Sequence, residues 1–131
     1  MDYRKHKSNE SIEDYLETIF LLEKKLGNVR SIDIANEMNF TKPSVSVAMK
    51  NLRELGYITV SENTFIILTD EGRIRAADVY ERHILLSNWL ISLGVNEDVA
   101  REDACRMEHD ISSESFSAIK SYIDKVSKDS K

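Results

Sequence analysis

Three residues with metal-binding side chains lie close together in the second half of the chain, in the stretch CRMEH. Cys105, Glu108 and His109 occupy positions i, i+3 and i+4 of an expected helix. A thiol, a carboxylate and an imidazole then project from one helix face within about 6 Å of one another. All three groups are ligands of divalent transition metals, so the spacing indicates a cation site on this face.

Three further donors lie on two other expected helices. Asp14 and Glu17 form a carboxylate pair at i and i+3, and His83 lies in an otherwise apolar stretch of the central helix. The six donors could close around one or two divalent cations. Each also has an ordinary structural interpretation: Cys105 as a small buried apolar side chain, His83 as a hydrogen-bonded core residue, and the acidic pair as a first helical turn that the helix dipole favours.

A second polar group lies at the start of another expected helix, in TKPSVSVAMKNLREL. Short hydroxyls and Lys near a helix N-terminus suit contacts with phosphates and base edges, because the first N–H groups are free and the dipole is favourable. The outward candidates are Thr41, Lys42, Ser44, Ser46 and Lys50. The alternative is a solvated polar face. Arg73 and Arg75, after the following hairpin, are expected either to touch backbone phosphate or to be exposed.

The elements that would position these residues are marked by local signals. The four glycines (27, 56, 72 and 94) are expected just past helix ends. Apolar spacing predicts a helix over 11–26 with Ser11 as its cap. Ser31 is expected to cap a short helix, and Pro43 suits the first turn of the next. These two helices predict a helix-turn-helix, and the alternating stretch GYITVSENTFIILT that follows predicts a β-hairpin.

The rest of the chain is predicted to be helical. One helix is expected to start at Thr69, a second to span 97 to about 111, and a third to begin near Ser113. Three helices enclose their own apolar faces poorly, so we expect a homodimer. The predicted fold is mainly α with a small β-hairpin wing: an N-terminal winged helix-turn-helix, 1–74, that binds DNA, and a C-terminal helical domain, 75–131, for dimerisation and metal binding.

Composition limits the classes of protein. The 131 residues are 41% hydrophobic and 31% charged, which is typical of a globular chain too short for a barrel enzyme. No apolar run suits a membrane helix or a signal peptide, so we expect a cytoplasmic protein with no membrane partner. The single cysteine excludes an internal disulfide. A net charge of −5 argues against nonspecific coating of nucleic acid; the excess lies in 97–114, with seven acidic and two basic residues.

With these residues in place, the chain resembles the metalloregulators of the diphtheria toxin repressor family, and its short form resembles the manganese transport regulator branch. The resemblance covers residues from about 8 to 125. It rests on the stretches SIEDYLETIFLLE, ANEMNFTKPSVSVAMKNLRELGYI, LTDEGRIRA, YERHILL and DACRMEHDIS. Of these, the Cys-x-x-Glu-His stretch is the most specific.

The resemblance implies a dimeric winged-helix repressor of metal-uptake genes that binds double-stranded operator DNA when Mn²⁺ or Fe²⁺ is bound, with one or two metals per subunit. The implied metal ligands are Asp14, Glu17, His83, Cys105, Glu108 and His109. The implied DNA contacts fall on Ser31, Thr41, Pro43, Ser44 and Ser46, and Lys42 and Lys50 join them from the helix pattern.

Three questions stay open at this stage. Asp14 resembles the manganese branch and Cys105 the iron branch, and the ligand chemistry favours neither metal alone. One alternative is a winged-helix regulator that senses a small ligand or the oxidation of Cys105 in place of metal. Another is a metal-dependent hydrolase, because the same donors can activate water; the expectation is that the protein is not an enzyme.

Overall fold

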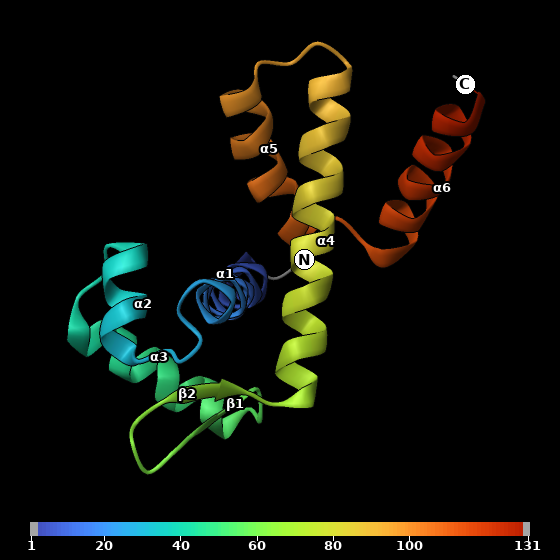
Figure 1. Ribbon diagram of the computed structural model, residues 1–131. Helices are drawn as coiled ribbons and strands as arrows, with labels where there is room; N and C mark the ends of the chain where they lie inside the picture. The colour runs from blue at the N-terminus through green and yellow to red at the C-terminus, as the bar shows by residue number, and fades with distance from the viewer. Residues whose placement is uncertain (1–2, 130–131) are drawn as a thin grey trace. The chain divides into compact units, whose positions relative to one another are not determined.

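The computed structural model describes the backbone of residues 3–129 and the side chains of residues 11–128. The elements follow one another as α1 (Tyr3–Leu26), α2 (Ser31–Met38), α3 (Lys42–Glu54), β1 (Ile58–Val60), β2 (Ile66–Leu68), α4 (Asp70–Ser92), α5 (Glu97–Asp110) and α6 (Ser113–Asp129) (Figure 1). The chain forms two compact units, which meet between Asp78 and Val79, inside α4. The predicted fold class, a winged helix-turn-helix followed by a helical domain, is confirmed.

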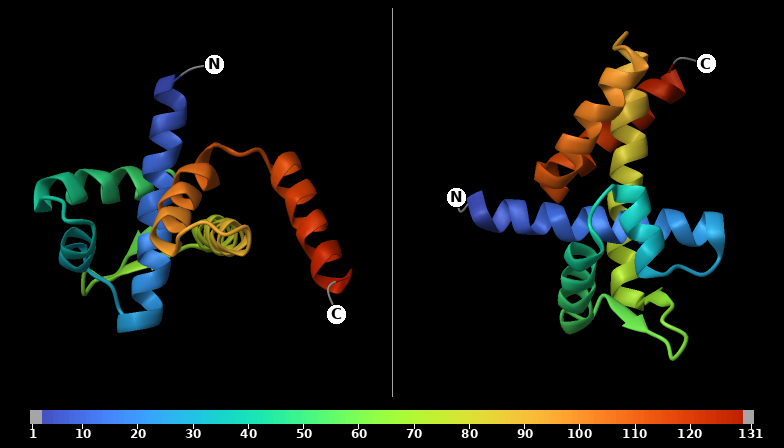
Figure 2. Two further views of the ribbon diagram at one scale, coloured as in Figure 1. Left: turned by 90° about the horizontal axis from the view of Figure 1, so that it is seen from above. Right: turned by 90° about the vertical axis from the view of Figure 1, so that its left-hand side faces the viewer.

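The first unit contains the helix-turn-helix and the wing. Helix α2 packs against both α1 and α3, and α1 also contacts β2 (Figure 2). The chain reverses between α2 and α3 at Asn39, whose φ of 57° is left-handed, and Pro43 lies in the first turn of α3. Strands β1 and β2 are antiparallel, with Thr59 opposite Ile67. These short connections hold α3 on the surface, directly before the wing.

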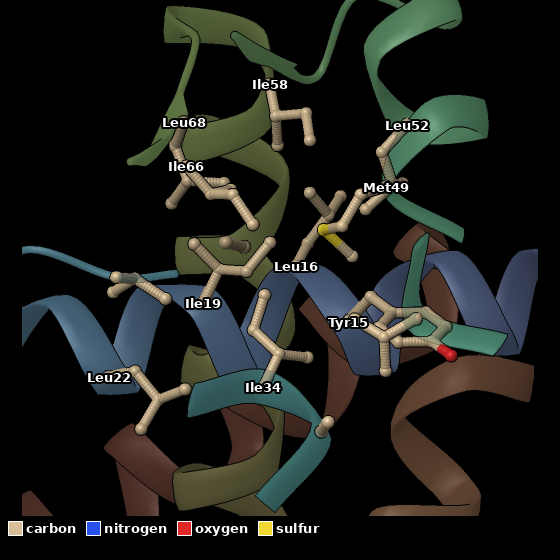
Figure 3. Packing of buried hydrophobic residues seen from close by; sticks show 14 residues of the cluster. Tyr15, Leu16, Ile19, Leu22, Ile34, Met49, Leu52, Ile58, Ile66 and Leu68 are labelled. Carbon is tan, nitrogen blue, oxygen red and sulfur yellow. The ribbon is translucent and has the colours of Figure 1, made fainter. Parts of the chain in front are cut away.

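An apolar core joins the elements of the first unit. Leu16 and Ile19 on one face of α1 are fully buried, and so is Ile34 of α2. Figure 3 shows how these side chains meet those of α3 and the hairpin. The other labelled members are Tyr15, Leu22, Met49, Leu52, Ile58, Ile66 and Leu68. The helical spacing of the apolar residues in α1 and α3 therefore leaves their polar faces outside, as the pattern predicts.

The second unit is built from the end of α4 with α5 and α6. Helix α5 runs beside this part of α4 (Figures 1 and 2). Its buried apolar cluster is small and contains Leu86, Ala104 and Phe116, one residue from each helix. Several large apolar side chains stay exposed, among them Ile84, Ile91, Tyr122 and Val126. No helix in the described part of the chain is long and apolar enough to cross a bilayer.

Two predicted helix starts were wrong. Helix α1 begins at Tyr3, so Ser11 lies inside it; the stretch before Ser11 contains no Gly or Pro that would stop a helix. Ser31 is the first residue of α2 and not its cap, a position that Arg30 occupies. The Arg30 N–H instead donates to the Asp33 carboxylate at 2.9 Å, so an acidic side chain in the first turn satisfies the helix end.

Gly72 does not follow a helix end, in contrast to Gly27, Gly56 and Gly94, whose φ angles are all positive. It lies in the first turn of α4, where a Cβ atom would be 2.0 Å from the carbonyl oxygen of Tyr57. The same turn is capped as predicted, because the Thr69 hydroxyl accepts the Gly72 N–H at 3.1 Å. Gly72 therefore allows the close approach of α4 to the start of the wing.

The two arginines at the start of α4 are paired within the first unit. Arg73 donates to both carboxylate oxygens of Glu23, at 2.9 and 3.3 Å. Arg75 donates to the Tyr57 hydroxyl at 2.7 Å and lies 3.7 Å from the Glu13 carboxylate. Arg73 is exposed, as one of the two expectations had it, and Arg75 is half-buried. The ion pairs that join α4 to α1, and the bond to Tyr57 before β1, were not expected from the sequence.

Candidate metal centre and nucleic-acid interface

Glu108 is the central residue of the candidate metal centre. Its side chain is fully buried on α5. One carboxylate oxygen, Oε2, lies 2.8 Å from Nδ1 of His83 on α4. The other, Oε1, lies 3.4 Å from Nε2 of His109 and accepts no hydrogen bond from the described residues. Both oxygens face imidazoles, so the charge of this carboxylate is not balanced by a Lys or Arg side chain among the described residues.

Cys105 and His109 lie beside Glu108 on the same helix. One ligand atom from each of the three residues lies within 4.8 Å of the others. The His109 side chain is almost fully buried, whereas Cys105 is exposed. Burying a carboxylate costs several kcal/mol of desolvation, and a divalent cation here would offset that cost. The donor set of carboxylate, imidazole and thiol therefore fits a transition metal ion.

The sequence of α5 explains how Glu108 becomes buried. Asn96 caps the helix by accepting the N–H groups of Asp98 and Val99. Ala100 and Ala104 are fully buried, and they lie on the same face as Glu108, two turns and one turn before it. Small side chains on this face let α5 approach its neighbours closely, and this brings the carboxylate to the ring of His83.

The two acidic residues of α1 belong to the first unit. Asp14 and Glu17 are both half-buried, and the backbone carbonyl of Asp14 accepts a hydrogen bond from the Thr18 hydroxyl at 2.8 Å. The structure thus brings together His83, Glu108, His109 and Cys105 within the second unit. The metal-binding roles of these four residues and of Asp14 and Glu17 all stay a prediction.

The predicted DNA-contacting residues other than Ser31, which begins α2, lie at the start of α3 and along its outer face. Thr41 is the N-cap: its hydroxyl accepts the Ser44 N–H at 3.3 Å and donates to the Ser44 hydroxyl at 2.9 Å. The exposed candidates are Thr41, Lys42, Pro43, Ser44, Ser46 and Lys50. Ser31 is half-buried. Thr41 and Ser44 therefore hold the helix start as well as presenting hydroxyls.

Two residues that the structure makes relevant to these sites were not singled out from the sequence. Val47 on α3 is 62% exposed; it lies one turn after Pro43, and this i+4 spacing on the outer face was the available signal. Arg82 directly precedes His83 and contacts the end of α5. Two of its partners are backbone carbonyls far along the chain, and residue types give no signal for such bonds.

The exposed recognition helix, the wing and the transition-metal donor set together define a class: a winged-helix DNA-binding regulator with a helical metal-binding domain. Comparison with known proteins leads to the same class. Residues 7–64 match the family model of the N-terminal DNA-binding domain of iron-dependent repressors. Residues 69–131 match the model of their metal-binding and dimerisation domain. The chain therefore belongs to the iron-dependent repressor family.

Individual relatives agree with this assignment. The chain is 35% identical over 116 residues to the transcriptional regulator MntR of Escherichia coli O6:H1, covering 88% of this chain and 75% of that protein. It is 32% identical over 119 residues to the HTH-type transcriptional regulator MJ0568 of Methanocaldococcus jannaschii, an uncharacterized protein, covering 89% and 95%.

Solved structures match over most of this chain. The metal-dependent transcriptional regulator MtsR superposes with a TM-score of 0.80 at 26% identity, and the manganese regulator SloR with 0.76 at 26%. Each match covers 86% of this chain and 53% of the other. The chain thus spans about half the length of these structures.

Proposed function

We propose that this protein is a transcriptional regulator that represses metal-uptake genes when Mn²⁺ or Fe²⁺ is bound. The observation that carries the proposal is the fully buried carboxylate of Glu108, 2.8 Å from His83 and beside His109 and Cys105. A bound cation would neutralise the charge of this buried carboxylate. The similarity to the manganese regulator SloR supports the same function, and we propose that it takes place in the cytoplasm.

The ligand set that we propose is drawn from both units. His83, Cys105, Glu108 and His109 come from the helical unit, and Asp14 and Glu17 from α1, as the resemblance to the family implies. Carboxylates favour Mn²⁺ and a thiolate favours Fe²⁺, so both metals belong in the test. Ligands from both units would couple metal binding to the position of the DNA-reading unit.

The DNA-binding step is carried by α3 and its N-terminus. Hydroxyls of Ser44 and Ser46 and the ammonium groups of Lys42 and Lys50 are exposed there, and such groups suit phosphate and base-edge contacts. We propose that the protein binds operator DNA as a homodimer, which would place two recognition helices about 34 Å apart, one turn of DNA. The exposed apolar residues of α4 and α6 support burial against a second copy.

DNA binding would depend on metal if metal binds the DNA-binding conformation of the protein more tightly than the inactive conformation. To convert a mostly inactive population into a mostly active one, metal must favour the DNA-binding conformation by up to about 5.5 kcal/mol. Without metal, the like charges of Asp14, Glu17 and Glu108 would repel one another, and this repulsion would favour separation of the ligands.

The test is a selection of duplexes from a random-sequence pool by the full chain with Mn²⁺ or Fe²⁺ under anoxia. Affinity for the selected duplex is then measured by fluorescence anisotropy, with metal and with excess chelator. We expect tight binding that chelator reverses, and that Glu108→Ala loses. Equal affinity with and without metal would refute the proposal.

A second candidate function is supported by the exposure of Cys105, a free thiol. In this alternative the regulator senses oxidation of Cys105, and metal plays no part. Cys105→Ser separates the two alternatives. If peroxide changes the DNA affinity of the chelator-treated wild type and not that of Cys105→Ser, the result would favour redox sensing. Loss of the metal response in the same variant would favour metal sensing.

A further inference from the structure

Arg82 on α4 contacts the region where α5 ends and α6 begins. Its Nη1 donates to the backbone carbonyls of Glu108 at 3.3 Å and Ile111 at 2.9 Å. Its Nη2 lies 3.2 Å from the Ser113 hydroxyl, to which it donates. The guanidinium carbon lies 5.4 Å from the centre of the Phe116 ring. One side chain therefore contacts the last turn of α5, the turn that follows it, and the first turn of α6.

The chemistry of these contacts is specific to arginine. The last carbonyls of a helix have no partner within the helix and carry partial negative charge, so a cation placed there is stabilising. A guanidinium is a planar group with several N–H donors, and it can bond separate acceptors at once. A lysine ammonium keeps the charge but not this geometry. Arg82 thus caps α5 from a neighbouring helix.

Arg82 and the next residue, His83, bind the same residue at its two ends. Arg82 holds the backbone carbonyl of Glu108, and His83 lies 2.8 Å from its carboxylate. Both the backbone carbonyl of Glu108 and its carboxylate are therefore held in position. His109, the next residue on α5, belongs to the turn that Arg82 caps.

We propose that Arg82 is a positioning residue for the metal centre. It fixes the last turn of α5, so that the donor atoms of Glu108 and His109 are in place before metal binds, and it joins that turn to α6 through Ser113 and Phe116. This inference rests on the proposed function, in which Glu108 and His109 are metal ligands. Residues that orient metal ligands typically change metal affinity about 10- to 100-fold when they are replaced.

The test uses Co²⁺ as the probe, with the chelator-treated full chain under anoxia. Arg82→Gln removes the charge and Arg82→Lys keeps it. The matched control is Arg106→Gln on α5, an exposed arginine paired with Asp103. Calorimetry gives the Co²⁺ affinity, and the absorption spectrum reports the ligand field and the thiolate of Cys105. Thermal unfolding without metal reports the structural effect separately.

We expect Arg82→Gln to bind Co²⁺ about 10-fold or more weakly and with an altered spectrum. Arg82→Lys should show a smaller loss of affinity, with a spectral change in the same direction, and it carries the test if Arg82→Gln does not fold. Arg106→Gln should match the wild type. The inference would be overturned if Arg82→Lys kept the wild-type Co²⁺ affinity and spectrum. It would also be overturned if a folded Arg82→Gln kept both and showed only a lower Tm. Failure of the wild type itself to bind Co²⁺ would instead refute the proposed function.

Discussion

Glu108→Gln is expected to stabilise the metal-free protein while removing its stabilisation by metal. The side chain is fully buried, and glutamine has nearly the same shape, so no cavity forms. The substitution removes a desolvation cost of several kcal/mol for the buried charge. It also weakens the bond to His83 from a charge-assisted to a neutral one, which costs about 1 kcal/mol. The expected net gain is about 1–3 kcal/mol.

Metal is expected to stabilise the wild type much more than Glu108→Gln. A ligand present at about 100 times its Kd stabilises the folded state by about 2.7 kcal/mol. For a chain of this size each kcal/mol raises Tm by about 3–5 °C, so the wild type should gain about 10 °C. The neutral amide of Glu108→Gln is a much weaker ligand, and its gain should be less than about 2 °C.

The assay is thermal unfolding, followed by circular dichroism, of chelator-treated protein with and without Mn²⁺ or Fe²⁺ under anoxia. Glu114→Gln is the control, because Glu114 is exposed in the first turn of α6 and its charge lies outside the proposed ligand set. A lower Tm of metal-free Glu108→Gln would contradict the argument about the buried charge. A full metal-induced shift in that variant would contradict its role as a ligand.

Three further predictions concern the first unit. Gly72→Ala places a Cβ 2.0 Å from the Tyr57 carbonyl oxygen and should lower the free energy of unfolding by about 2–3 kcal/mol in urea titrations; a gain, as helix propensity alone predicts, would contradict this packing. Burial raises the pKa of Tyr15, so its phenol stays neutral in the folded state at pH values where the unfolded chain ionises; stability should fall as pH rises above about 10, and less so in Tyr15→Phe. An equal loss in both proteins would exclude this contribution. Lys50→Gln should reduce the slope of log K against log salt for DNA binding by about 0.9 per subunit, measured by anisotropy, and an unchanged slope would place Lys50 outside the interface.

The order of elements was predictable because its signals are local. Gly27 and Gly56 end helices with positive φ angles, Thr69 caps α4, and the alternation of apolar residues gives the hairpin. The wrong helix starts also come from relying on local signals. Ser31 is a good cap residue by type, but Arg30 takes the position while Asp33 accepts its N–H. Such a choice depends on the path of the backbone, which the residue types do not specify.

The metal centre was only partly predictable. Spacing on one helix places Cys105, Glu108 and His109 together without any knowledge of the fold. The spacing does not say that Glu108 is fully buried while Cys105 is exposed, because burial depends on how α5 packs. Arg82 was not predictable, since it bonds backbone carbonyls that any residues could supply at those positions.

The central claim is that the chain binds a divalent metal through His83 and Glu108. The most direct measurement is an anoxic calorimetric titration of chelator-treated protein with Mn²⁺ and, separately, with Fe²⁺, in the wild type and in His83→Ala and Glu108→Ala. We predict saturable binding of at least one ion by the wild type, lost in both variants, with the stoichiometry giving one or two metals per subunit. Absence of saturable binding of either ion by the wild type, or unchanged binding in both variants, would contradict the account.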